Sequence, residues 1–349
     1  MEIEKLNYDL PPELIAQKPA PNRAGSRMLV LDRSADSLLD SGFSQIVSFI
    51  NKGDCFVINN TKVLPARFFA QKSTGAKIEG LFIAAENNNW LVMLKNSSRL
   101  KQGETLNLLD RNKKTFCTAV IDTKLEQGQW LIKPALSLPS MRILETIGFA
   151  PLPPYIKRPD PASEHQLDTN RYQTVYAAQN GAIAAPTAGL HFTPEILEQI
   201  KAKGISIAQI TLHVGQGTFL PVKTKTLEEH KIHSEEYFID AENAQIINKT
   251  IQSKGRIFAV GTTAVRTLET VAEKYGKIIA AQGRTELFIT PGFEFKITDA
   301  MLTNFHLPKS TLLALVAAFA GLDKILAAYK HAVDEKYRFY SYGDCMLIL

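Results

Sequence analysis

Three histidines, His191, His213 and His306, lie at or just beyond the carboxyl ends of segments that the sequence predicts to be strands. Because imidazole changes its charge near neutral pH, a histidine at a strand end can act as a general acid or base. A single histidine in such a place is more often a hydrogen-bonded part of the core. Three of them weaken that interpretation and favour proton transfer at a shared site.

The segment from His230 to Glu236 adds another group of ionisable side chains. It contains neither a thiolate nor a third suitably spaced histidine, so we expect no metal site. Two alternatives remain open: His233 or Glu235 transfers a proton, or the segment is a solvated acidic face without a function. We retain His233 and Glu235 as catalytic candidates beside the three histidines at strand ends.

Three loops are expected to position these groups. In open α/β sheets, ligands bind outside the carboxyl ends of the strands, where free N–H groups of helix N-termini attract anions. Such loops are predicted at Thr187 to His191, Gly261 to Thr263, and Asn304 to Lys309, and Thr193 and Ser310 are predicted to cap helices that follow. The neighbouring elements predicted from periodicity are a helix at Ser44 to Asn51 and strands at Cys55 to Asn59, Ile183 to Ala185, Ile205 to Val214, Arg256 to Val260 and Met301 to Thr303.

Two further features suggest contacts to a ligand. Gly215 and Gly217 form a G-x-G that lacks the third glycine and the helix of a dinucleotide fingerprint, so the pair either lets the backbone approach a ligand or forms a tight turn. Arg266 is predicted in the first turn of a helix, where a cation requires an anionic partner. A substrate carboxylate and a structural ion pair with Glu269 or Glu286 both satisfy that requirement.

Composition limits the class of protein. The chain has 349 residues, of which 45% are hydrophobic, and this is typical of a globular protein with two domains. Its three cysteines form no CxxC pair, which fits a reducing compartment. The acidic N-terminus is unlike a signal peptide, and the most apolar run, Thr311 to Ala320, is half of the roughly 20 residues that a membrane span needs. We expect a cytoplasmic protein that does not contact membranes.

The fold class predicted is α/β. Short apolar segments alternate with turn signals between Arg67 and Pro134, which is typical of a small antiparallel barrel. Because alternating strands and helices resume afterwards, we predict that a large mixed-sheet domain, residues 1–65 and 148–349, carries the barrel as an insertion at residues 66–147.

Basic side chains suggest where nucleic acid could bind. The net charge of +5 permits such binding without requiring it. Phosphate groups would be contacted by Lys62, Arg67, Lys157 and Arg158, with Tyr155 as a stacking partner for a base, although solvated surface charge is the default interpretation of each cluster.

Eleven ordered motifs are similar to those of one enzyme family. They are YDLPPELIAQKP, SRMLVLDR, FVINNTKVLPAR, LPPYIKR, RYQTVYA, AAPTAGLHFT, TLHVGQGTF, HKIHSE, AVGTTAVRTLE, TNFHLPKSTLL and YRFYSYGDCMLI. Through them nearly the whole chain resembles the S-adenosylmethionine:tRNA ribosyltransferase-isomerases of queuosine biosynthesis.

The resemblance implies a reaction. The ribosyl part of S-adenosylmethionine would be transferred to the aminomethyl group of a deazaguanine at the wobble position of tRNA with a GUN-type anticodon. Isomerisation would give epoxyqueuosine, with release of adenine and methionine. S-adenosylmethionine would be a co-substrate, and neither a metal nor a tightly bound cofactor is expected.

This chemistry suggests roles for the candidate residues. The sulfonium acidifies the adjacent ribose methylene, so a base is needed there, and adenine departure needs an acid. We hypothesise that the four histidines and Glu235 share these roles, while aromatic faces such as Phe192 or Tyr340 contact the sulfonium. The expected substrate contacts are Thr187, Gly215, Gly217, Thr262, Thr263 and Arg266. Among them, Arg266 with Thr262 and Thr263 would hold the methionine carboxylate by a bidentate contact and helix N–H groups.

Two other functions are compatible with parts of the sequence. An RNA methyltransferase that uses S-adenosylmethionine would need a glycine-rich loop after its first strand, and the sequence has none there. A non-catalytic RNA-binding module would use the barrel and the basic charge alone, and it predicts that the histidines can be replaced without loss of function.

Overall fold

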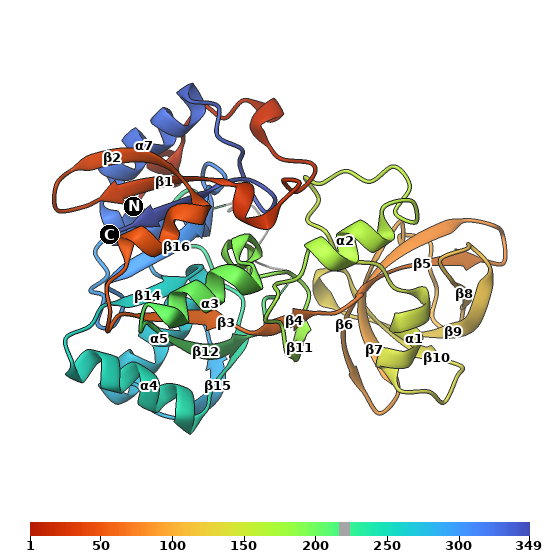
Figure 1. The fold of residues 1–349 in the computed structure, drawn as a ribbon. Coiled ribbons are helices and arrows are strands. Elements are labelled where there is room, and N and C mark those ends of the chain that lie inside the picture. The colour runs from red at the N-terminus through yellow and green to blue at the C-terminus, as the bar shows by residue number, and fades with distance from the viewer. Residues whose placement is uncertain (216–223) are drawn as a thin grey trace. The chain divides into compact units, whose positions relative to one another are not determined.

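The computed structural model describes residues 1–215 and 224–349, and the chain divides into two compact units (Figure 1). The larger unit comprises residues 1–62, 154–156 and 173–349, and the smaller one comprises residues 63–153 and 157–172. The larger unit contains a mixed sheet with helices, and the smaller one contains a closed antiparallel barrel. The predicted fold class is confirmed. The limits of the insertion, 66 and 147, stay a prediction.

A nine-stranded sheet forms the centre of the larger unit, in the order β15-β13-β12-β3-β14-β16-β17-β1-β2. Strands β12, β3, β14 and β16 run parallel to one another, so their carboxyl ends meet at the same edge (Figure 1). The bounds of the nine strands are β1 Arg27–Asp32, β2 Ser37–Gly42, β3 Cys55–Asn59, β12 Ser206–Leu212, β13 Glu235–Ile239, β14 Ile257–Val260, β15 Ala281–Thr285, β16 Ala300–Asn304 and β17 Cys345–Ile348.

Each face of this sheet is covered by helices. Alternate residues of β3 separate into two cores: Cys55 and Val57 pack with the apolar residues of the α4, α5, α6 and α7 helices, and Phe56 and Ile58 pack with those of η4 and α3. Because side chains of a strand alternate between faces, a continuous apolar run such as β3 is expected in a strand buried on both sides. The helices are α3 Pro194–Ala202, α4 Ala241–Gln252, α5 Thr262–Tyr275, α6 Thr311–Ala320 and α7 Leu322–Asp334, with 3₁₀ turns η1 Ile3–Leu6, η2 Pro12–Leu14, η3 Arg23–Gly25, η4 Phe43–Phe49 and η6 Thr187–His191.

Helix boundaries follow local chemistry. The Thr193 side chain accepts a hydrogen bond from the Ile196 N–H at the start of α3, and the Ser310 side chain accepts one from the Leu313 N–H at the start of α6, as predicted. Gly321 ends α6 with φ 93°, a conformation that favours glycine.

Two predicted elements differ from the structure. The helix predicted at Ser44 to Asn51 is the 3₁₀ turn η4, whose residues turn more tightly than in an α-helix. The strand predicted at Ile183 to Ala185 is wrong, since the short strand β11 (Gln179–Ala182) ends before it and Ile183 N–H donates to the carbonyl of Val214 beyond β12.

Six antiparallel strands close the barrel of the smaller unit in the order β10-β7-β6-β5-β8-β9. Phe68 and Phe82 pack against the ring of Trp90 inside it, at centroid distances of 6.1 and 5.1 Å. Gly80 is required beside them, because a Cβ atom there would lie 2.2 Å from the Phe68 ring. The strands are β5 Arg67–Lys72, β6 Lys77–Glu86, β7 Asn89–Lys95, β8 Thr105–Leu109, β9 Thr115–Lys124 and β10 Gln129–Pro134, with helices α1 Ser140–Ile147 and α2 His165–Arg171, the turn η5 Glu126–Gly128, and strand β4 Thr61–Val63 before the barrel.

Within residues 1–215 and 224–349, no single helix has the length and apolar composition to cross a membrane. The pair α6 and α7, bent by 114° at Gly321, satisfies those two criteria only when taken together.

Candidate active site

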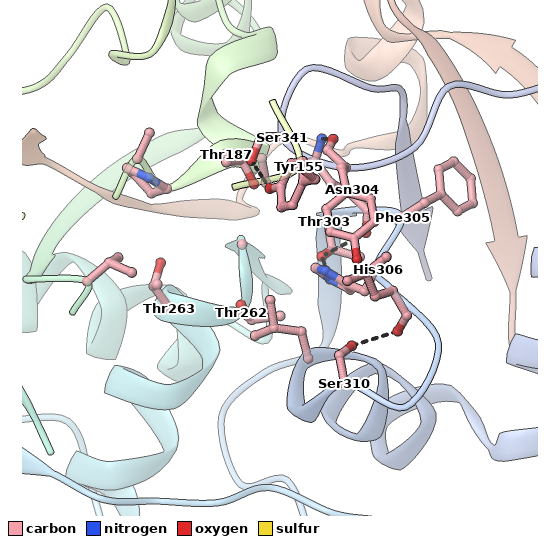
Figure 2. Close-up of a pocket in the computed structure, with 18 of the residues that line it drawn as sticks. Tyr155, Thr187, Thr262, Thr263, Thr303, Asn304, Phe305, His306, Ser310 and Ser341 are labelled. Carbon is pink, nitrogen blue, oxygen red and sulfur yellow. Dashed lines mark hydrogen bonds between the residues drawn. The ribbon is translucent and has the colours of Figure 1, made fainter. Parts of the chain in front are cut away.

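A pocket lies in the larger unit, where β14 and β16 end (Figure 2). All three predicted loops contribute to it, and so do the segments around Tyr155 and Tyr340. Figure 2 shows Thr262 and Thr263 on one side of the pocket, with Thr303, Asn304 and His306 on the other. The lining residues are Tyr155, Ala185, Pro186, Thr187, Ala188, Val214, Gly261, Thr262, Thr263, Thr303, Asn304, Phe305, His306, Leu307, Pro308, Ser310, Leu312, Tyr340 and Ser341.

The start of helix α5 faces this pocket. Gly261 precedes the helix with φ 86° and no side chain caps it, so the first N–H groups of the helix carry partial positive charge toward the pocket. Thr263 is 8% exposed, and among the described residues its hydroxyl has no hydrogen-bond partner. A buried hydroxyl without a partner is costly, so this side of the pocket is suited to a polar ligand.

His306 stands on the opposite side. Its Nε2 lies 2.8 Å from the hydroxyl oxygen of Thr303, and its backbone N–H donates to the Tyr329 hydroxyl at 3.0 Å. The Tyr8 hydroxyl donates to the His306 carbonyl, which fixes the backbone from the other side. Burial lowers the pKa of His306 to about 3, so the ring is neutral at physiological pH.

His191 lies behind the pocket wall and does not line it. Its Nε2 lies 3.2 Å from the Asn304 amide nitrogen, which donates, so the proton sits on Nδ1 and is donated to the Ser26 hydroxyl at 2.9 Å. Burial, followed by the charges of Arg23 and Arg338, lowers the pKa of His191 to about 3. With both nitrogens engaged and the side chain 4% exposed, His191 supports Asn304 from behind the pocket wall.

Asn304 is held in a single orientation. Its amide nitrogen also lies 3.1 Å from the carbonyl oxygen of Tyr340 and 3.3 Å from that of Asp344. Both oxygens can only accept, so the two N–H groups of the amide are shared among these oxygens and His191 Nε2. The amide oxygen is buried and has no partner among residues 1–215 and 224–349. Asn304 therefore contributes an unpaired acceptor to the part of the fold that forms the pocket wall.

Two tyrosines complete the wall. The rings of Tyr155 and Tyr340 have centroids 4.2 Å apart, and the Tyr155 hydroxyl lies 2.6 Å from the Ser341 hydroxyl. Tyr340 has φ 75°, a strained conformation for a residue with a side chain, and such strain is frequent at functional sites. Phe192, the other aromatic candidate, is fully buried in the second core and does not line the pocket.

Arg266 and Glu235 form a buried ion pair in a second, adjacent pocket, which is also lined by His230 and His233. Arg266 is the fifth residue of α5, beyond its first turn, and its Nε donates to the Leu287 carbonyl at 3.1 Å. The predicted ion pair of Arg266 with Glu269 or Glu286 is wrong, since its partner is Glu235. The Glu269 carboxylate instead accepts hydrogen bonds from the backbone N–H groups of the 296–298 segment.

The comparison with known proteins identifies the family. The family model described as "Queuosine biosynthesis protein" matches residues 3–348. The chain belongs to this family.

Two relatives match this chain over nearly their whole length. A protein of Syntrophomonas wolfei named S-adenosylmethionine:tRNA ribosyltransferase-isomerase is 48% identical over 342 residues, which cover 98% of this chain and 96% of that protein. A protein of Trichlorobacter lovleyi with the same name is 47% identical, and all of both chains is covered. The crystal structure of S-adenosylmethionine tRNA ribosyltransferase from Thermotoga maritima is 36% identical, with a TM-score of 0.57 over 99% of this chain and 100% of that one.

The structure separates the candidate histidines of this family member. His306 lines the first pocket, His233 lines the second, and His213 lines a groove beside β13 and β15. The Nδ1 of His213 lies 2.8 Å from the Thr61 hydroxyl, and burial lowers the pKa of this histidine. The expected cluster of four histidines around one ligand is therefore not formed.

The predicted glycine contacts have different outcomes. Gly215 N–H donates to the Glu235 carboxylate at 2.9 Å, so this backbone group supports the ion pair. Gly217 lies outside the described residues. Among residues 1–215 and 224–349, no three His, Cys, Asp or Glu side chains are close enough to hold a metal ion.

Of the basic residues predicted to contact phosphate, two lysines are exposed and two arginines are ion-paired. Lys62 in the larger unit and Lys157 in the smaller unit are exposed. Arg67 is paired with Glu79 at 3.0 Å. Arg158 is 3% exposed and makes a bidentate contact with Asp168, with both distances 2.8 Å, so its charge is already compensated inside the smaller unit. The structure therefore favours a structural role for Arg158, in place of the predicted phosphate contact.

The sequence pattern does not single out Asn304, Thr303, Ser341 or Leu312, all of which line the pocket. Asn304 stood in the predicted loop but carries no titratable group. The unpaired state of its oxygen depends on carbonyls from the 340–344 segment, which no local pattern places beside it.

Proposed function

We propose that the protein is an S-adenosylmethionine:tRNA ribosyltransferase-isomerase. It transfers the ribosyl part of S-adenosylmethionine to the aminomethyl-deazaguanine at the tRNA wobble position and isomerises it to the epoxyqueuosine side chain. Adenine and methionine leave. The observation that carries this proposal is the 47–48% identity to proteins of that name over 98–100% of this chain.

The first pocket is the proposed site for the adenosyl part of S-adenosylmethionine. Thr262, Thr263 and the N-terminus of α5 supply polar groups that suit ribose oxygens, and Thr187 contributes from the facing loop. The electron-rich faces of Tyr155 and Tyr340 suit the sulfonium, because a cation is attracted to an aromatic face within about 6 Å.

His306 is the proposed hydrogen-bond partner of the departing adenine. Its ring is neutral, since burial keeps its pKa at about 3, and a neutral imidazole can still donate a hydrogen bond to developing negative charge. His191 acts through Asn304, which it orients. Because His213 and His233 lie outside the first pocket, the proposal gives them no contact with the ribose.

The proposed second substrate is tRNA with a GUN-type anticodon, which the enzyme would bind in the cytoplasm. Recognition of RNA sequence usually requires unstacked bases, and an anticodon loop offers them. Lys62 and Lys157 are the proposed phosphate contacts because their side chains are exposed. S-adenosylmethionine is consumed as a co-substrate, and the proposed reaction uses no resident cofactor.

The products test the proposal. The protein is incubated with S-adenosylmethionine and tRNA that carries the aminomethyl base, and small molecules are separated by chromatography. Release of free adenine and methionine in equal amounts is expected. Formation of S-adenosylhomocysteine would instead identify a methyltransferase, and binding of tRNA without any product would identify an RNA-binding module.

A further inference from the structure

The second pocket adjoins the first one. Leu312 of α6 lines both, and α5 contributes Thr263 to the first pocket and Arg266 to the second. Residues three positions apart lie on the same side of a helix and are separated by about 4.5 Å along its axis. One extended ligand along α5 could therefore contact both pockets.

One nitrogen of Arg266 has no hydrogen-bond partner among residues 1–215 and 224–349. The residue is 7% exposed, its Nε donates to the Leu287 carbonyl, and its Nη1 is paired with Glu235. Its Nη2 is buried without a hydrogen-bond partner among the described residues. Because the Arg266 backbone is inside a helix, its side chain is the part that reaches the pocket. A buried guanidinium donor without an acceptor is costly, so a ligand acceptor is expected there.

The charges around this nitrogen determine which ligand group fits. Arg266 and Glu235 compensate each other, and burial, followed by the nearby His233, lowers the pKa of His230 and so favours its neutral form. A phosphate or another single anion would bring an uncompensated charge into this buried place. A group with one carboxylate and one ammonium adds no net charge and offers a partner to each member of the pair.

We propose that the second pocket binds the α-amino-acid end of S-adenosylmethionine. The carboxylate accepts from Arg266 Nη2, and the ammonium donates to the Glu235 carboxylate, while the adenosyl end occupies the first pocket. This assignment rests on the proposed function. Burying an ion pair costs more desolvation free energy than burying apolar residues of similar size. Recognition of a zwitterionic ligand explains why the Arg266–Glu235 pair is nevertheless retained at this place.

The test compares S-adenosylmethionine with decarboxylated S-adenosylmethionine, which keeps the sulfonium and the amine. Adenine release on modified-base tRNA is measured for both compounds with the wild-type chain, Arg266→Met and Arg284→Met. Arg284 is the matched control because it also pairs with a β13 glutamate, Glu236, but both of these side chains are more than half exposed.

The wild-type chain and Arg284→Met should prefer the carboxylate-bearing compound by about 10- to 100-fold in kcat/KM, the range of one charged hydrogen bond. Arg266→Met should reduce this preference to less than about 3-fold by raising KM, since the carboxylate lies away from the reacting atoms. If Arg266→Met does not fold, the pair is replaced together as Arg266→Met with Glu235→Leu, which leaves no unpaired buried charge.

Two results would overturn the inference while leaving the proposed function intact. One is normal adenine release with no preference in the wild-type chain. The other is an unchanged preference in a folded Arg266 variant. Failure of the wild-type chain to release adenine from S-adenosylmethionine would refute the proposed function itself.

Discussion

The replacement His191→Leu separates an orienting role from a catalytic one. At pH 7 it removes the hydrogen bonds to Ser26 and Asn304, each worth about 1 kcal/mol, so unfolding should become easier by about 2 kcal/mol. Asn304 keeps its two carbonyl partners, so it loses only part of the support that fixes its amide oxygen. Turnover should therefore fall by less than roughly 10-fold, whereas loss of a proton-transfer residue costs about 100-fold or more.

The same variant has a distinctive pH dependence. Burial lowers the pKa of His191 from 6.5 to about 3 in the folded chain, so below pH 6.5 the unfolded chain binds a proton that the folded chain does not. Stability from the neutral histidine is thus complete above pH 6.5 and is lost as the pH falls toward 3, by about 1.4 kcal/mol per unit. By pH 5 the wild-type chain loses about 2 kcal/mol from this group, and its advantage over His191→Leu should vanish.

Urea unfolding at pH 7 and pH 5 measures this change. Unfolding of the larger unit, which contains His191, should be followed by hydrogen exchange of β14 and β16. Tryptophan fluorescence would report on the barrel unit instead, because both tryptophans, Trp90 and Trp130, lie there. Ser26→Ala is the control: it removes one hydrogen bond but keeps the histidine, so its destabilisation of about 1 kcal/mol should be equal at both pH values. A difference between wild type and His191→Leu that stays constant between pH 7 and pH 5 would refute a buried neutral histidine, and a 100-fold loss of turnover would refute the orienting role.

Three further predictions concern the pocket and the basic residues. Thr263→Val should raise KM for S-adenosylmethionine by about 5-fold in steady-state assays, without loss of thermal stability, because the hydroxyl has no partner within the described chain. Lys62→Ala should weaken tRNA binding by roughly 5-fold and lower the slope of its salt dependence by about one, whereas the exposed Lys277, just past the far end of α5, should have no effect when replaced by alanine. Arg158→Met should leave tRNA affinity nearly unchanged but destabilise the barrel unit by about 3 kcal/mol in fluorescence unfolding curves, because Asp168 loses its buried partner; loss of affinity in a stable variant would contradict this.

The parts of the fold that depend on local pattern were predicted from the sequence. The apolar run of β3, the cap at Thr193 and the cap at Ser310 depend on neighbouring residues only, and all three agree with the structure. The barrel was recognised because its turns and alternating strands recur at short intervals. The strand predicted at Ile183 to Ala185 is wrong, because a hydrogen bond to the chain beyond β12 decides the conformation of this segment.

The site was predicted only in part, for a related reason. Parallel strands bring their carboxyl ends together, so the three loops were expected at one place, and they do line one pocket. Which side chain of a loop points into the pocket depends on partners distant in sequence. His191 is turned away by Ser26, 165 residues earlier, and Arg266 is held by Glu235 in place of either predicted glutamate.

The most direct test of the central claim follows the carbon atoms of the substrate. S-adenosylmethionine labelled with ¹³C in all ribose carbons, or in the methyl group alone, is incubated with the protein and modified-base tRNA, and the wobble nucleoside is analysed by mass spectrometry. Ribosyl transfer predicts that every ribose label appears in the nucleoside and that the methyl label remains in free methionine. A methyl label in the tRNA, or a nucleoside without ribose label, would contradict the account.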